Sequence, residues 1–184
     1  MNTRKMFLGV ATVLAGIGLL GACAPAPTPD PYVPPTGPTD TKTIDLTCSV
    51  FVPSISLTTS ATHSATITLT GTDPTPSGTG IAYAVDISGG IKNGPVATTG
   101  GSIELFTSLD GAPEEETATG VLPATAGSAF VVVPQLSGTS AAITAQAELH
   151  LTKITYTANA PSGDAFGTCV IAYGSQPGIL IDVV

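Results

Sequence analysis

The sequence predicts an all-β protein, and three observations carry this prediction. The 184 residues include 21 glycines and 16 prolines, which interrupt helices. Threonine and valine are frequent, and β-branched side chains suit a pleated strand. Short runs of alternating apolar and polar residues recur between turn-forming residues, which is the pattern of strands with one buried face.

Eight segments are expected to be strands. They cover residues 43–52, 63–71, 81–88, 102–108, 128–133, 141–158, 166–173 and 178–184. In the first segment, Ile44, Leu46, Cys48 and Val50 share the inward face. Clusters of glycine and proline separate most of the segments, so we expect turns between them.

The longest pattern covers residues 141–158 and contains a change of phase. Apolar residues occupy every second position up to Leu151, whereas beyond Lys153 they continue from Ile154 on the opposite phase. Because side chains alternate with a period of two, one inserted residue keeps both sets on the same face. The sequence therefore predicts a β-bulge near Thr152 and Lys153.

Short strands at this spacing are typical of an antiparallel β-sandwich of immunoglobulin-like size, with about eight strands. We expect this domain to cover residues 42–184, and a closed barrel is the alternative arrangement. The longest expected loops, 72–80 and 109–120, are candidates for binding a partner at one end of the sandwich.

The N-terminal segment has the features of an export signal. Arg4 and Lys5 precede an uncharged apolar run that ends in Leu20-Gly21-Ala22-Cys23. These residues resemble the signal peptide and lipobox of bacterial lipoproteins. The resemblance implies that residues 1–22 are removed and that a diacylglycerol is attached to the Cys23 sulfur.

Two other fates of the signal remain open. One is cleavage at an Ala-x-Ala site after Ala24 or Ala26, which leaves a proline as the first residue, and the other is an uncleaved signal anchor. Residues 23–41 are rich in proline, which removes amide donors and fixes φ, so they are expected to form an extended tether. With a lipid on Cys23, the expected location is the extracytoplasmic face of the cell membrane.

The chain is acidic, with a formal net charge of −8 at pH 7. Beyond the export signal, its basic residues are Lys42, Lys92 and Lys153, which are widely spaced in the sequence. Nucleic-acid binding needs clustered cations, so no nucleic-acid partner is expected, and the domain itself is not expected to bind anionic lipid head groups. No motif indicates a cofactor.

Two cysteines remain in the domain if Cys23 is lipidated. An exported protein meets an oxidising compartment, so Cys48 and Cys169 are expected to form a disulfide between the first strand and a late strand. Two separate buried thiols are the alternative.

Three features of the domain occur together: Ile44-Asp45-Leu46-Thr47-Cys48, the threonine-rich strands that follow, and Phe166-Gly167-Thr168-Cys169 before a last apolar strand. In these features the chain is similar to an uncharacterised domain of actinobacterial exported proteins, over residues 43–184. The resemblance implies a secreted immunoglobulin-like sandwich with a disulfide between its first and last strands. It implies no activity and no functional residue.

Two groups of polar side chains are candidates for chemistry. Glu148 and His150 are two apart on a strand, so they would project side by side as an acid–base pair or as half of a metal site. An exposed polar face without either role is the simpler interpretation. Asp110 and residues 114–116 group carboxylates in a loop, but they lack the spacing of calcium loops, so a solvated acidic turn and no metal are expected.

Three hypotheses of function follow. The first is a binding or structural module of the cell envelope, with a protein or glycan partner. The second is a carrier of a hydrophobic small molecule, with a cavity left between the sheets by small inward residues such as Ala65, Ala145 and Ala147. The third is an enzyme that uses Glu148 and His150 in a cleft, and because no catalytic motif is present, no enzymatic activity is expected.

Overall fold

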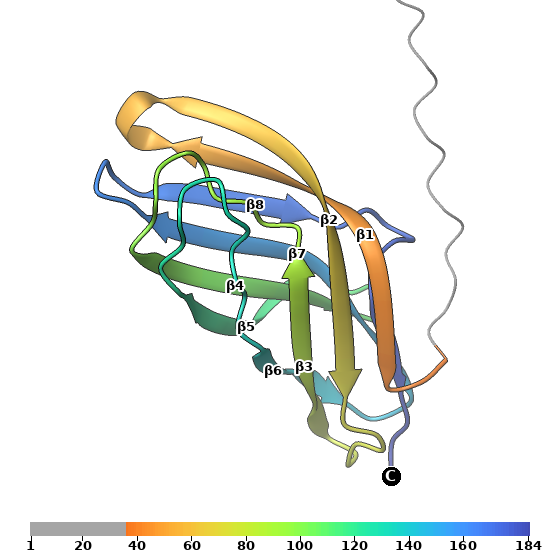
Figure 1. Cartoon of the computed structure of the whole chain (residues 1–184). Helices are drawn as coiled ribbons and strands as arrows, with labels where there is room; N and C mark the ends of the chain where they lie inside the picture. The colour runs from red at the N-terminus through yellow and green to blue at the C-terminus, as the bar shows by residue number, and fades with distance from the viewer. Residues whose placement is uncertain (1–35) are drawn as a thin grey trace, which may run out of the picture.

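The computed structural model describes residues 36–184, so the predicted signal peptide 1–22, Cys23 and most of the tether lie outside the described residues. Residues 36–184 form nine strands, one 3-10 turn and no α-helix. The elements are β1 Thr39–Val52, η1 Pro53–Ile55, β2 Leu57–Gly71, β3 Thr79–Gly89, β4 Gly100–Leu109, β5 Glu115–Leu122, β6 Leu136–Ile143, β7 Ala147–Asn159, β8 Ala165–Val170 and β9 Gly178–Ile181 (Figure 1). Because β1 begins at Thr39, residues 39–41 belong to the first strand and not to the tether.

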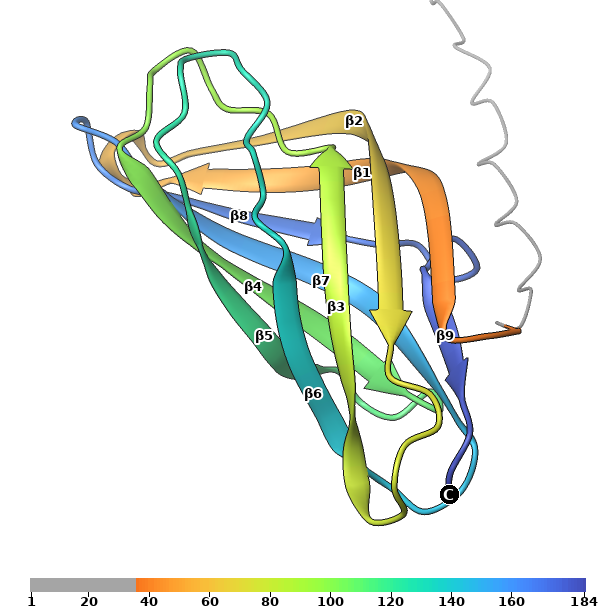
Figure 2. The same ribbon diagram turned by 60° about the horizontal axis from the view of Figure 1, so that its bottom comes forward.

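All nine strands belong to one antiparallel sheet. The strand order is β5-β4-β7-β8-β1-β2-β3-β6, and β9 pairs with β7 beside this path. The sheet curls until the two outer strands, β5 and β6, come into contact (Figures 1 and 2). At this seam Leu136 of β6 lies against Gly120 of β5, where a side chain on residue 120 would overlap it.

The architecture is therefore an antiparallel, nearly closed barrel. It confirms the prediction of an all-β antiparallel fold. It does not confirm the immunoglobulin-like sandwich, because hydrogen bonding joins the strands into one sheet and not into two separate sheets. A strongly curved sheet and a sandwich share the same alternating pattern along each strand, so the pattern alone does not distinguish them.

The first four expected strands correspond to β1–β4, and their predicted inward residues are buried or half-buried. Two other predictions are wrong. The segment 128–133 is a loop, in which Phe130 makes an isolated bridge with Lys92. Residues 141–158 do not form one strand, because β6 ends at Ile143 and β7 begins at Ala147.

The expected loop 109–120 is much shorter than predicted. Strand β5 begins at Glu115, which leaves only a tight turn after β4. This turn has positive φ at Asp110 (49°) and at Gly111 (72°). The loop therefore does not provide the extended binding surface that its composition suggested.

The predicted β-bulge is present in β7. Opposite β4, the register passes from Phe106↔Lys153 to Thr107↔Leu151, so Thr152 is the extra residue. The Thr152 hydroxyl donates a hydrogen bond to the Phe106 carbonyl over 3.0 Å. The bulge lets the apolar residues on both sides of it face the interior.

The interior of one half of the barrel is tightly packed. Its fully buried large side chains come from six of the nine strands, and they are Leu46, Ile67, Leu69, Ile81, Ile103, Leu105, Leu149, Leu151, Ile154, Ile179 and Ile181. Burial of a side chain of this size contributes about 1.5–3 kcal/mol, so this half supplies much of the stability of the fold.

Cys48 and Cys169 are joined by a disulfide. The two residues are directly opposite each other on β1 and β8. The bond therefore links neighbouring strands whose cysteines are 121 residues apart in the sequence. A disulfide between the first strand and a late strand was expected.

The outer face of β1 and β2 is rich in threonine. Threonine hydroxyls form hydrogen bonds across the two strands in three pairs, which are Thr41–Thr68 (2.9 Å), Thr43–Thr66 (3.0 Å) and Thr47–Thr62 (2.8 Å). Cross-strand threonine pairs stabilise a sheet modestly and give it a polar surface with few charges.

Candidate functional site

The other half of the barrel contains a cavity of about 570 Å³. It lies between the end of the β1–β2 hairpin and two loops, 90–99 and 123–135, which arch over the same end of the barrel (Figures 1 and 2). Strands β7 and β8 contribute to its wall as well. A volume of this size is in the range of binding sites for small molecules.

The cavity exists because the sheet is incomplete at this end. Strand β3 pairs with β2 only along residues 65–71 of β2, whereas residues 57–64 of β2 pair only with β1. The chain turns away from β2 after β3, through Gly89 (φ 77°) and Gly90 (φ 76°). A side chain on Gly90 would overlap Ala65, so glycine permits this close crossing.

Small inward residues leave the space open, but they are not the ones predicted. The cavity is lined by Ala61 of β2, Ala158 of β7 and Ala165 of β8. The three alanines named from the sequence lie elsewhere. Ala65 and Ala147 belong to the packed core, and Ala145 is exposed in the β6–β7 turn.

The lining is mostly apolar. Large aliphatic side chains such as Val50, Leu57, Ile91, Leu122 and Val131 form much of the wall. None of the described aspartate or glutamate side chains lines the cavity, although the chain contains 13 acidic residues. A cavity with a mostly apolar wall and no described carboxylate in its lining is suited to an apolar ligand.

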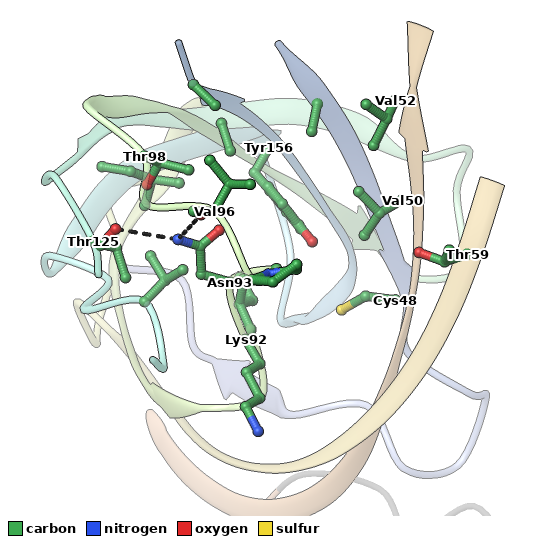
Figure 3. A pocket seen from close by; sticks show the side chains of 18 of the residues that line it. Cys48, Val50, Val52, Thr59, Lys92, Asn93, Val96, Thr98, Thr125 and Tyr156 are labelled. Atoms are coloured by element: carbon green, nitrogen blue, oxygen red, sulfur yellow. Dashed lines mark hydrogen bonds between the residues drawn. The ribbon is translucent and has the colours of Figure 1, made fainter. Parts of the chain in front are cut away.

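Tyr156 is the most buried polar side chain in the cavity wall. Its ring lies over Gly167, its partner on β8, where a Cβ atom would overlap the ring. Tyr156 is 8% exposed, and its hydroxyl points into the cavity (Figure 3). Burial raises the pKa of the Tyr156 phenol above its ordinary value, so the hydroxyl stays protonated at neutral pH.

Asn93 connects the two loops that cover the cavity. Its Nδ2 lies within hydrogen-bond distance of the carbonyl oxygens of Val96 (3.1 Å), Thr125 (3.2 Å) and Ala126 (3.1 Å) (Figure 3). Because carbonyl oxygens only accept, the amide nitrogen must face the loops. The Asn93 side chain thereby fixes loop 90–99 against loop 123–135.

Two basic side chains lie at the edge of the cavity, beside Phe130. The rings of His63 and Phe130 meet edge to face, with centroids 5.6 Å apart. The Lys92 ammonium lies 5.8 Å from the centre of the Phe130 ring. In Figure 3, this ammonium is directed away from Tyr156. Lys92 is exposed, so its charge is at the surface and not inside the cavity.

The Glu148–His150 pair lies away from the cavity. His150 Nε2 is 3.3 Å from Glu148 Oε2, as expected for side chains two apart on a strand. However, His150 is 9% exposed, so its expected place on an exposed polar face is wrong. The ring is covered by Gly178 of β9, where a Cβ atom would overlap it. His63 lines the cavity and His150 does not.

The acidic turn after β4 uses its carboxylates within the fold. Asp110 Oδ1 accepts a hydrogen bond from the Glu148 amide over 2.7 Å. Glu114 Oε2 is 2.6 Å from Lys153 Nζ, and this hydrogen bond lowers the pKa of Glu114 below its ordinary value. Among residues 36–184, no group of three His, Cys, Asp or Glu side chains is placed to hold a metal ion.

The chain matches no protein-family model, no curated protein and no solved structure. In the described part of the chain, no helix has the length and apolar character needed to cross a membrane. The interpretation of the site therefore depends on its own geometry.

Proposed function

We propose that this protein binds a hydrophobic small molecule in the cavity at the end of the barrel. The observation that carries the proposal is an apolar cavity of about 570 Å³ that no described carboxylate lines. A water-filled space with such a wall is unfavourable, and transferring an apolar ligand into it removes apolar area from water on both surfaces.

The N-terminal sequence supports an exported, lipid-anchored carrier. The lipobox-like Leu20-Gly21-Ala22-Cys23 and the proline-rich residues that follow favour a barrel tethered to the outer face of a membrane. A protein in this location is close to a reservoir of apolar molecules. The disulfide fits an oxidising compartment outside the cytoplasm.

This proposal places the carrier ahead of the two other functions considered from the sequence. A binding or structural module of the envelope would not require a cavity of this size. An enzyme that uses Glu148 and His150 would need them at a cleft, but the His150 ring is covered by Gly178 and neither residue lines the cavity. We therefore assign no catalytic role to the pair.

The experiment is a titration with N-phenylnaphthylamine, a neutral apolar dye whose fluorescence rises when it leaves water. We expect saturable binding of one dye per chain. Replacing Ala158, which lines the cavity, by tryptophan (Ala158→Trp) should fill the space and abolish binding. The matched control is Ala145→Trp, in the exposed turn between β6 and β7, which should bind the dye like the original protein.

Two results would contradict the proposal. One is the absence of saturable binding by a protein whose disulfide and β-sheet spectrum are intact. The other is equal binding by the Ala158→Trp and Ala145→Trp variants, which would place the dye at another site. Native mass spectrometry of protein from an exporting host adds a direct readout, because a ligand acquired in the cell appears as extra mass that disappears on denaturation.

A further inference from the structure

Two polar side chains of the cavity wall, Tyr156 and Asn93, can form hydrogen bonds with a ligand. The Tyr156 hydroxyl forms no hydrogen bond with any of residues 36–184, although Tyr156 is only 8% exposed. The hydroxyl opens onto the cavity, so a bound ligand can supply the hydrogen bond that the protein does not.

Asn93 supplies a complementary group. Its Nδ2 is occupied by the carbonyl oxygens of the two loops, which leaves Oδ1 on the other side of the amide. In Figure 3 this oxygen is directed to the side on which Tyr156 lies. The cavity therefore offers a donor on Tyr156 and an acceptor on Asn93.

The surroundings disfavour a charged ligand. The ammonium of Lys92 is exposed beside Phe130, and the His63 ring packs against the same phenyl ring. No described carboxylate lines the cavity. An ionised group next to Tyr156 would thus lose its hydration without gaining an opposite charge, which is strongly unfavourable.

We infer that the ligand is a neutral alcohol or phenol on an apolar body, whose hydroxyl accepts a hydrogen bond from Tyr156 and donates one to Asn93 Oδ1. This inference rests on the proposed function, because it specifies the class of small molecule that the cavity binds. Tyr156 then acts as the residue that selects for an oxygen atom inside an otherwise apolar site.

The test compares four probes that share one ring system: naphthalene, naphthol, methoxynaphthalene and naphthoate. Dissociation constants are measured by calorimetry on the disulfide-bonded protein. Naphthol should bind about tenfold more tightly than naphthalene, because its hydroxyl forms a hydrogen bond with Tyr156 that naphthalene cannot form. Methoxynaphthalene accepts a hydrogen bond but cannot donate one, so its affinity should lie between these two. Naphthoate should bind most weakly.

The variant Tyr156→Phe separates the hydroxyl from the ring. It should weaken naphthol binding about tenfold and leave naphthalene binding unchanged, so that naphthalene also reports that the cavity is intact. The control is Tyr173→Phe, which removes a hydroxyl from an exposed tyrosine outside the cavity and should change neither constant.

The outcomes distinguish this inference from the proposed function. Equal affinities for naphthalene and naphthol, or a Tyr156→Phe variant that keeps the preference for naphthol, would overturn the inference while the carrier function stands. Equal affinities for methoxynaphthalene and naphthol would show that the ligand donates no hydrogen bond to Asn93. Tightest binding of naphthoate would overturn the inference that the ligand is neutral. Failure of all four probes to bind would overturn the inference and the carrier function together.

Discussion

At the scale of single residues, the cavity depends on a contact between a tyrosine and a glycine. Tyr156 is held flat against the sheet because Gly167, opposite it on β8, has no side chain. This arrangement fixes the ring without a hydrogen bond to its hydroxyl, which leaves the hydroxyl for a ligand. Neither residue belongs to a recognisable motif, since the two are brought together only by strand pairing.

Substitution of Gly167 by alanine should displace Tyr156. The new Cβ atom would overlap the ring, so we expect a loss of about 1–3 kcal/mol in the free energy of unfolding, typical of overpacking. Urea denaturation measures this loss. Gly37→Ala is the control, since the space around Gly37 is open, and it should change the stability little. Equal stability of the two variants would show that the ring is not held by this contact.

The pKa of Glu114 gives a second prediction at this scale. The hydrogen bond from Lys153 lowers this pKa, so the interaction stabilises the folded protein above the pKa of Glu114 in the unfolded chain. The stabilisation is lost as the pH falls through the lower, folded-state pKa. An NMR titration of the carboxyl carbon should show this low value, and Lys153→Met should raise it towards the ordinary value. The control is Lys42→Met, because Lys42 is next to Asp40 and not Glu114. In this variant the pKa of Glu114 should not change.

At the scale of elements, the β-bulge of β7 marks the place where this strand changes neighbours. Up to His150 it pairs with β9, and from Lys153 onwards it pairs with β8. Thr152 lies between these two sections, and its carbonyl accepts a hydrogen bond from Ile171 over 2.9 Å. The extra residue thus accommodates two partner strands on one edge while the apolar residues keep facing inwards.

The variant Thr152→Val tests whether the threonine hydroxyl supports the bulge. It removes the hydrogen bond to the Phe106 carbonyl at a site where residue 152 is 5% exposed. We expect a loss of about 1 kcal/mol in the free energy of unfolding. The comparison is Thr119→Val, the same change on the exposed face of β5, which should have a much smaller effect. If Thr152→Val did not change the free energy of unfolding, packing alone would determine the position of the bulge.

Sequence alternation predicted some elements and missed others for physical reasons. In β1–β4 the inward positions hold large apolar residues, so the period of two is clear, and the phase change at Lys153 correctly indicated the bulge. In β5 the inward residues Ala118 and Gly120 are small, and Leu136 occupies the space beside Gly120, so the alternation is weak. The apolar run 128–133 suggested a strand but covers the cavity as a loop, with Phe130 half-exposed.

At the scale of the whole molecule, the barrel combines a packed half with a hollow half. Large aliphatic residues fill one end, and the cavity occupies the other, with Ile91, Leu122 and Val131 near the boundary. The cavity could not be predicted from the sequence, since its wall comes from distant parts of the chain and depends on where β3 leaves β2. The residues that fill the packed half and the residues that line the cavity are therefore largely different.

The disulfide connects the first and the eighth strand, so its loss should affect the whole fold. Replacing both Cys48 and Cys169 by alanine should lower the free energy of unfolding by about 2–5 kcal/mol, because the bond closes a long loop in the unfolded chain. Calorimetric or urea unfolding measures the change. Reduction of the original protein by dithiothreitol should produce a similar loss. If the double variant were as stable as the oxidised protein, β1–β8 pairing alone would hold this part of the barrel.

The single amide of Asn93 has a consequence for how fast the cavity exchanges its contents. Its nitrogen faces the carbonyl oxygens of Thr125 and Ala126 on the other loop, and backbone hydrogen bonds such as that from the Ser128 amide to the Gly94 carbonyl join the same two loops, so separating the loops disrupts these contacts together. Under the proposed function, a ligand whose release requires these loops to separate would have a long residence time. Such a protein would pass through dilution and chromatography with its native occupant still inside, so the first material to analyse for that occupant is the purified protein itself.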